Sequence, residues 1–287
     1  MGLRGKLGIA AAGLAAFLMV AGHTQALRAT EYATGIEAFV GERVTAEQRR
    51  TAAVRIMSEL ADAGIEAKLQ PYDTGNTSWA LDLVLPPVSG ANVAVEVPST
   101  EPSEETIVIG AHYDSVRGSP GADDNASGTY AVIELAKRVS EMPVRRMNVV
   151  FVWFDQEEVG LVGSKIFAAN WKASGLALHS MHNIDMIGFD GNGDGRFDLD
   201  VPDGELAEIY LEEAGALGIA IARDTFNSSD HASFRKFGFR AVCLSEDFSN
   251  KDINPTYHRG GDKTIDREYM QSGIDLVAAV MKRLLEK

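Results

Sequence analysis

The chain has 287 residues, of which 45% are hydrophobic, so it is long enough to bury one sizeable core. Its formal net charge of −14 at pH 7 makes nucleic acid and anionic membranes poor partners. Cys243 is the only cysteine, which excludes an intrachain disulfide. It lies in an apolar run, and we expect an inert core residue.

The first 26 residues predict a signal peptide. A basic start with Arg4 and Lys6 precedes an apolar run over residues 7–20, and small residues then allow cleavage after Ala26. The run is short for a membrane span, which makes an uncleaved anchor the weaker alternative. We therefore expect a secreted or periplasmic protein, without membrane attachment after cleavage, whose single domain covers residues 27–287.

Helix and strand patterns alternate along the rest of the chain. A capping box at Thr45–Gln48 opens a helix that Gly64 closes. Strands are predicted at residues 65–70, 79–85, 92–97, 106–111, 147–154, 176–187 and 240–244, and later helices at 131–139, 161–171, 202–217 and 264–286. This order predicts an α/β fold, a single-domain three-layer sandwich with a mostly parallel central sheet and helices on both faces.

Three acids follow the predicted strand at residues 147–154. That run is almost entirely apolar, which is typical of a strand buried on both faces. Asp155, Glu157 and Glu158 come directly after it. Carboxylates there are costly unless a cation or substrate compensates their charge, and open α/β sheets bind ligands at this end of their strands. The sequence therefore predicts a ligand site around these acids.

Five potential metal ligands stand after or beside predicted strand ends: His112, Asp124, Glu158, Asp185 and His258. Each is a weak signal alone, but in a parallel sheet the loops that carry them converge on one edge. Imidazole and carboxylate together suit zinc, although other divalent ions accept the same donors. Two histidines and three carboxylates exceed the needs of one tetrahedral ion. They fit two ions about 3.5–4 Å apart that share a carboxylate.

The motifs HYDS, PGADDNASG, FDQEEVGLVGS, NIDMIG and a late YH occur in this order over residues 112–258. They resemble the co-catalytic di-zinc aminopeptidases of the secreted bacterial leucyl-aminopeptidase type, within the zinc exopeptidase clan. The resemblance implies two Zn²⁺ ions per chain and often a cis peptide after the bridging aspartate. It implies these ligands: His112 and Asp185 for one ion, Glu158 and His258 for the other, and Asp124 as the bridge.

The resemblance also implies that Glu157 is the general base. Glu157 and Glu158 are adjacent and cannot point the same way from one strand end, so one can bind metal while the other reaches the attacking water. Glu157 would take the proton of that water and deliver it to the leaving amine. Asp114, two residues after His112, suits a role in orienting the imidazole, with a solvated turn acid as the alternative.

Two further residues have open roles. Tyr257 stands beside His258, where some relatives use a tyrosine to polarise the scissile carbonyl, and plain packing is an equal alternative. Asp230, in a Ser-Asp-His element, matches a recurrent position of the family without a definite role. Phe226 and Phe248, together with Tyr257, are candidates for the pocket that selects the N-terminal residue.

An acidic loop predicts a structural calcium site. Its residues follow the EF-hand spacing at positions 1, 3, 5, 6 and 9: Asp190, Asn192, Asp194, Gly195 and Asp198. Position 12 is Val201 instead of glutamate, with Asp200 and Asp203 near enough to substitute. An acidic, glycine-rich surface loop is the alternative.

These features predict an exported monomeric metallo-aminopeptidase that acts on peptides with a free N-terminus. One alternative is a glutaminyl-peptide cyclotransferase, which uses a single zinc on a related fold. Those enzymes usually carry tryptophan before the last histidine, where this chain has Tyr257. A non-catalytic binding module is the other alternative. Its hallmark would be the loss of Glu157 or of a ligand, and all of them are present.

Overall fold

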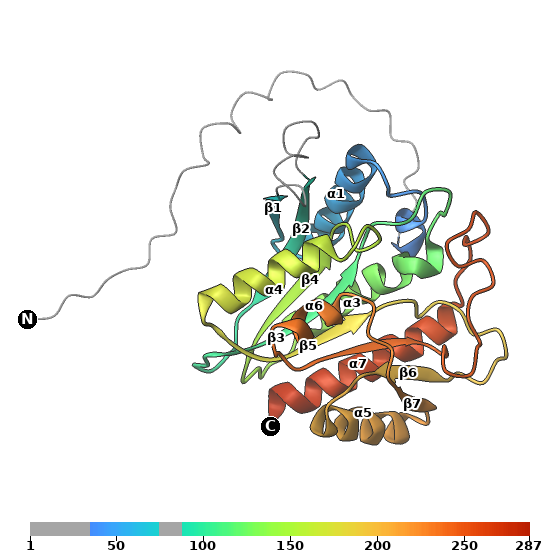
Figure 1. Cartoon of the computed structure of the whole chain (residues 1–287). Coiled ribbons are helices and arrows are strands. Elements are labelled where there is room, and N and C mark those ends of the chain that lie inside the picture. The colour runs from blue at the N-terminus through green and yellow to red at the C-terminus, as the bar shows by residue number, and fades with distance from the viewer. Residues whose placement is uncertain (1–34, 75–87) are drawn as a thin grey trace, which may run out of the picture. The chain divides into compact units, whose positions relative to one another are not determined.

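The computed structural model describes residues 35–74 and 88–287 (Figure 1). The predicted signal peptide and the strand predicted at residues 79–85 lie outside the described residues. Among the described residues, no helix combines the length and apolar character that a membrane span requires.

The described strands form one mixed sheet in the order β1-β2-β4-β3-β5-β8-β6-β7 (Figure 1). Their bounds are β1 (Lys68–Thr74), β2 (Val88–Val97), β3 (Glu105–His112), β4 (Asn148–Phe154), β5 (Ala177–Ile184), β6 (Phe197–Asp200), β7 (Ile221–Asp224) and β8 (Ala241–Glu246). The central strands β4, β3, β5 and β8 run parallel. Antiparallel pairs flank them, with β1 and β2 on one side and β6 against β8 on the other. The predicted α/β class with a parallel centre is confirmed.

Helices cover both faces of this sheet (Figure 1). Their bounds are α1 (Ala46–Asp62), α3 (Gly128–Ser140), α4 (Val162–Ser174), α5 (Gly204–Leu217), α6 (His231–Lys236) and α7 (Arg267–Glu286). The larger core contains residues of α1, α3, α5 and α7, and the smaller core lies under α4 and α6. The capping box of α1 is present, because Thr45 accepts the amide of Gln48 while the Gln48 side chain accepts the amide of Thr45.

Strand β6 was not predicted, because its residues were assigned to the acidic loop. Only two of its four side chains are apolar, Phe197 and Leu199, and both are fully buried in the larger core. Phe197 stacks on Tyr269 of α7 with ring centroids 4.1 Å apart. Side chains alternate along a strand, so Asp198 and Asp200 face the other side of the sheet. The acids at alternate positions made this segment look like a polar loop, although its two apolar side chains pack in the core.

A buried arginine joins the segment before α1 to the loop that follows β3. Arg43 is 4% exposed, and its guanidinium donates hydrogen bonds to the carbonyls of Phe39, Gly41, Tyr113, Pro120 and Gly121. Burial lowers its pKa to about 10, although nearby carboxylates oppose that shift. A planar guanidinium can serve several acceptors at once, whereas an ammonium offers a single point charge.

We therefore expect Arg43→Lys to lower the free energy of unfolding by about 2–4 kcal/mol, since several buried carbonyls lose their donors. Urea unfolding followed by circular dichroism measures the change. Arg50→Lys, at an exposed position of α1, is the matched control and should stay within about 0.5 kcal/mol of wild type. Equal losses in the two variants would contradict a structural role for Arg43.

Candidate metal centre

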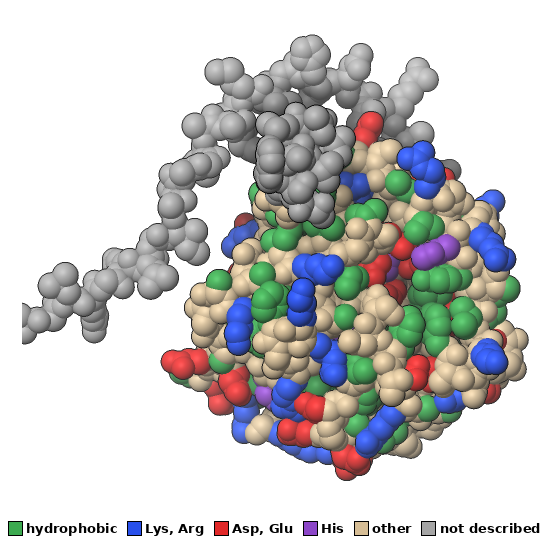
Figure 2. Space-filling model, viewed as in Figure 1, with side chains coloured by type: hydrophobic (Ala, Val, Ile, Leu, Met, Phe, Trp, Pro, Cys, Tyr) green, Lys and Arg blue, Asp and Glu red, His purple; other side chains and the backbone are tan. Residues whose placement is uncertain are grey.

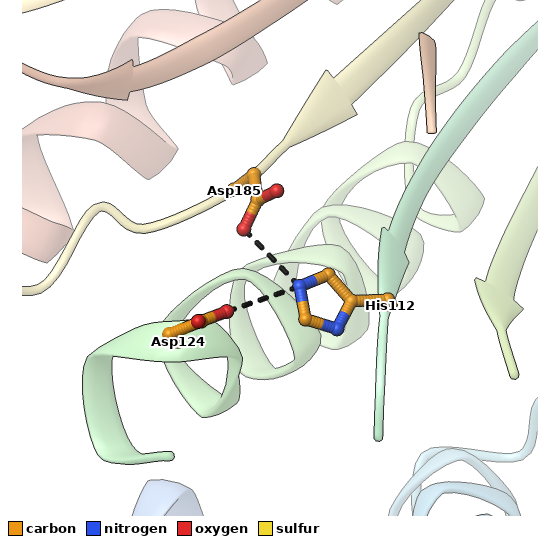
Figure 3. Close-up of side chains that lie close together, drawn as sticks. All are labelled: His112, Asp124 and Asp185. Atoms are coloured by element: carbon orange, nitrogen blue, oxygen red, sulfur yellow. Dashed lines mark hydrogen bonds and ion pairs between the residues drawn. The ribbon is translucent and has the colours of Figure 1, made fainter. Parts of the chain in front are cut away.

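The predicted ligands meet at the carboxyl ends of the parallel strands. His112 is the last residue of β3, Glu158 follows β4, and Asp185 comes directly after β5. Asp124 lies in the helical turn Ala122–Ser127, and His258 in the connection from β8 to α7. Figure 3 shows the carboxylates of Asp124 and Asp185 directed at the same ring nitrogen of His112.

Asp124 stands between two groups of donors. Its Oδ1 lies 3.1 Å from Nε2 of His112, which is also 3.3 Å from Oδ1 of Asp185. Its Oδ2 lies 3.0 Å from Nε2 of His258, which is 3.2 Å from Oε2 of Glu158. One carboxylate thus presents each oxygen to a different histidine and acid. In each group the potential ligand atoms lie within 4.8 Å of one another.

The electrostatics of this cluster favour bound cations. Burial and the neighbouring charge of Asp124 raise the pKa of Glu158 to about 8. Burial also raises the pKa of Glu157 well above its ordinary value. His112 is buried, which opposes protonation, yet the carboxylates around it raise its pKa well above the usual range. The raised pKa values show that these glutamates favour their neutral form while no cation is bound, and divalent ions would compensate the charge of the ionised carboxylates. The mixture of imidazole and carboxylate fits zinc.

Asp114 holds the backbone of the strand-end acids and lies beside the first histidine. Its Oδ1 accepts the amide of Glu157 at 3.0 Å, and its Oδ2 accepts the amide of Glu158 at 3.2 Å. Oδ1 also lies 3.4 Å from Nδ1 of His112, but that nitrogen has no hydrogen-bond partner among the described residues. The orienting role therefore stays a prediction, while the contacts to the backbone of both glutamates are a finding of the structure.

The backbone next to the ligands is strained. Gln156, Met186 and His258 have φ values of 61°, 58° and 58°, in the left-handed region that non-glycine residues rarely adopt. Each such residue costs roughly 1–3 kcal/mol and persists only where the surrounding structure imposes it. The peptide between Asp124 and Asn125 is cis, as the resemblance implies.

A cavity of about 160 Å³ opens beside the donors. Figure 2 shows acidic side chains in a hollow beside a histidine, with hydrophobic side chains next to them. Four of the five donors, all except His258, line this cavity together with Glu157 and the following residues: Met186, Asp200, Phe226, Ser228, Ser229, Cys243, Ser245, Phe248 and Tyr257. Cys243 is 1% exposed, so it is buried as predicted, but it also forms part of the cavity wall.

Residues 92–281 match the model described as Peptidase family M28, which covers more than half of the chain. The chain belongs to peptidase family M28. It is 32% identical over 188 residues to a probable leucine aminopeptidase of Trichophyton verrucosum, covering 60% of this chain and 50% of that protein. It is 28% identical over 204 residues to aminopeptidase YwaD of Bacillus subtilis, covering 68% and 44%. The chain thus spans about half the length of the curated relatives it matches.

Two solved structures have the same fold as this M28 chain. The zinc aminopeptidase BSAP of Bacillus subtilis superimposes with a TM-score of 0.73 at 17% identity, covering 86% of this chain and 92% of that chain. A glutaminyl cyclase of Bacteroides thetaiotaomicron, bound to N-acetylhistamine, superimposes with a TM-score of 0.70 at 16% identity, covering 86% and 93%. At these identities the likeness shows the fold alone, and it does not separate the two activities.

Two residues that were not predicted from the sequence contact the cluster of potential metal ligands or its backbone. Asp262 accepts the amides of Asp123 and Asp124 at 2.9 and 3.3 Å. The Ser229 hydroxyl donates to Oδ2 of Asp185 at 2.5 Å. Ser229 begins the Ser-Asp-His element, which was the one signal for it. Asp262 lies far along the chain in a loop without a local pattern, so nothing in the sequence indicated its contact.

The remaining predicted residues have these positions. Tyr257 is 38% exposed, lines the cavity and stacks on His258 with ring centroids 3.8 Å apart. Asp230 is fully buried, and burial raises its pKa to about 7. The roles of both residues stay predictions.

The acidic loop holds itself together with side-chain contacts to backbone amides. Asp190 accepts the amides of Gly193 and Gly195, and Asn192 and Asp194 each accept the amide two residues on. Asp198 instead accepts the amide and the hydroxyl of Ser249. Within the described residues, every group of potential metal ligands lies around His112, Asp124 and Glu158. None of these groups includes Asp190, Asn192, Asp194 or Asp198. Calcium binding stays a prediction.

The raised pKa of Glu158 predicts how the metal-free protein responds to pH. Burial of a protonated Glu158 contributes to the stability of the folded state. This contribution is fully present below the unfolded pKa of about 4.5, and it is lost as the pH rises through the folded pKa of about 8. The melting temperature of metal-free wild type should therefore fall across this window relative to Glu158→Gln, which cannot ionise. Zinc loading should reduce the fall. A constant difference between wild type and variant from pH 5 to 8.5 would contradict the prediction.

Proposed function

We propose that this chain is an exported zinc aminopeptidase that removes N-terminal residues from peptides. The observation that carries the proposal is Asp124, whose two oxygens face separate groups of donors, each with one histidine and one further carboxylate. This arrangement suits two ions that share a ligand, and such pairs occur in aminopeptidases. The probable leucine aminopeptidases and aminopeptidase YwaD among the relatives support the same activity.

The five predicted ligands would hold the ions. His112 and Asp185 would bind one zinc, Glu158 and His258 the other, and Asp124 both. When bound, the two ions polarise the scissile carbonyl and lower the pKa of a water molecule towards 7.

Glu157 is the general base of the proposed mechanism. It lines the cavity, and Asp114 holds its amide, which fixes where the side chain begins. Glu157 accepts a proton from the attacking water and delivers it to the leaving amine nitrogen. Burial raises its pKa, and a base is most effective when its pKa lies near the working pH. Tyr257 lines the cavity, and within this proposal it would polarise the scissile carbonyl.

Export and assembly are further parts of the proposal. The basic and apolar pattern of residues 1–26 supports secretion or delivery to the periplasm. Within this proposal the mature chain acts as a monomer on peptides with a free N-terminus.

Metal counting together with an activity assay tests the proposal. Protein purified without chelators should contain two zinc ions per chain and release free amino acids from aminoacyl anilides. Chelation should abolish the activity, and added zinc should restore it. One zinc with ammonia release from an N-terminal glutamine peptide would instead show cyclase chemistry. No bound metal and no turnover would favour a binding module.

Two variants distinguish the proposed role of Glu157 as general base from that of Asp124 as the shared metal ligand. Glu157→Gln should lower kcat roughly 10²- to 10⁴-fold and keep both zinc ions, because only the proton acceptor is lost. Asp124→Asn should lose zinc together with activity, because it removes the shared charge. Glu96→Gln, at an exposed position of β2, is the matched control. Metal loss in Glu157→Gln, or two retained ions in Asp124→Asn, would overturn the respective assignment.

A further inference from the structure

The cavity has a polar end that the metal donors do not explain. Asp200 of β6 and Ser245 of β8 line it, and their strands are antiparallel neighbours. Their side chains are nearly inaccessible, with exposed fractions of 1% and 3%. Asp200 belongs to none of the potential metal-binding groups found among the described residues.

The Asp200 carboxylate is only half satisfied. Its Oδ2 accepts a hydrogen bond from the Ser245 hydroxyl at 3.2 Å, while its Oδ1 has no hydrogen-bond partner within residues 35–74 and 88–287. Burial and the nearby carboxylates of Asp224 and Asp198 raise the pKa of Asp200 to about 8. A buried acid with an open oxygen is costly unless a donor or cation contacts it. In the part of the chain that the structure describes, no lysine or arginine lines this cavity.

The wall of the same cavity is aromatic. Phe226 and Phe248 stack with ring centroids 5.6 Å apart and planes inclined by 10°, and Phe226 is 46% exposed. Aromatic faces pack well against methylene groups and attract a cation that passes over them. The volume of about 160 Å³ compares with an engineered cavity of about 150 Å³ that holds benzene, so it has room for the end of one side chain.

A cavity that combines an aromatic wall with a buried carboxylate matches a side chain with a methylene stem and a cationic end. Lysine and arginine are the two amino acids with that construction. We propose that Asp200 binds the side chain of a basic N-terminal residue and makes the enzyme prefer peptides that begin with lysine or arginine. The proposal rests on the proposed function, because it takes the cavity beside the metal donors as the place of the N-terminal residue.

The selectivity of zinc-loaded wild type and Asp200→Asn tests the proposal. The values of kcat/KM for lysyl, arginyl and leucyl anilides should favour the basic residues in wild type. Asp200→Asn should lower the lysine-to-leucine ratio roughly 10- to 100-fold, the range expected for a charged hydrogen bond. Asp62→Asn, at the exposed end of α1, is the matched control, because Asp62 does not line the cavity. It should leave the ratio unchanged.

Binding of free amino acids gives a second reading that does not require turnover. L-lysine and L-norleucine differ in the ammonium group, so calorimetry on zinc-loaded wild type should show tighter binding of L-lysine. Asp200→Asn should remove that difference. The wild-type comparison needs no variant and therefore decides the matter even if Asp200→Asn does not fold.

The outcomes separate this inference from the proposed function. Turnover with a leucine preference that Asp200→Asn does not move would overturn the inference and keep the aminopeptidase. Equal weakening of L-lysine and L-norleucine in Asp200→Asn would show that Asp200 holds the α-amine instead, and would also overturn it. Absence of all turnover would remove the aminopeptidase, and the calorimetric comparison would then stand as the test of a cation site at Asp200.

Discussion

Repulsion between buried and half-buried carboxylates at one edge of the sheet is the constraint on which the rest of this structure depends. Glu157, Glu158 and Asp185 follow strands whose residues are buried, and Asp124 lies among them. The two histidines compensate part of this charge, which is why His112 has a raised pKa while that of Asp124 is held below its usual range. Bound cations would compensate the remaining charge, and the hydrogen bonds of the surrounding residues hold the arrangement in place without them.

The same kind of hydrogen bonding holds the backbone at two of the loops that carry potential metal ligands. Asp114 accepts the amides of Glu157 and Glu158, and Asp262 accepts the amides of Asp123 and Asp124. In each case one carboxylate takes two consecutive amides, and a carboxylate acceptor forms stronger hydrogen bonds than a neutral one. Two successive residues are thereby fixed in the backbone, although ligand atoms of Glu157, Glu158 and His112 still lie within 4.8 Å of one another. A fixed backbone of this kind would allow the two adjacent glutamates to take the different tasks proposed for them, one as metal ligand and the other as base.

The sequence allowed the clustering of the potential metal ligands to be predicted because strand ends are easy to locate. Apolar runs of β3, β4 and β5 mark where each strand stops, and parallel pairing then brings His112, Glu158 and Asp185 to one edge. The contacts that support these donors were not predictable in this way. Asp262 and Arg43 act on loops far away in the chain, and only the folded backbone brings their partners within reach. Strand β6 was missed because two of its four residues are acids.

Strand β6, which was not predicted from the sequence, contributes side chains both to the larger core and to the cavity lining. Phe197 and Leu199 anchor β6 in the larger core, so the opposite side chains have little freedom to move. Asp200 is one of them, and its position follows from the packing of its neighbours rather than from a mobile loop. A carboxylate held in this way cannot swing out to solvent when the cavity is empty. Its burial cost is therefore present in the free protein and is relieved when a cationic group contacts it, which favours a basic side chain over an apolar one of the same length.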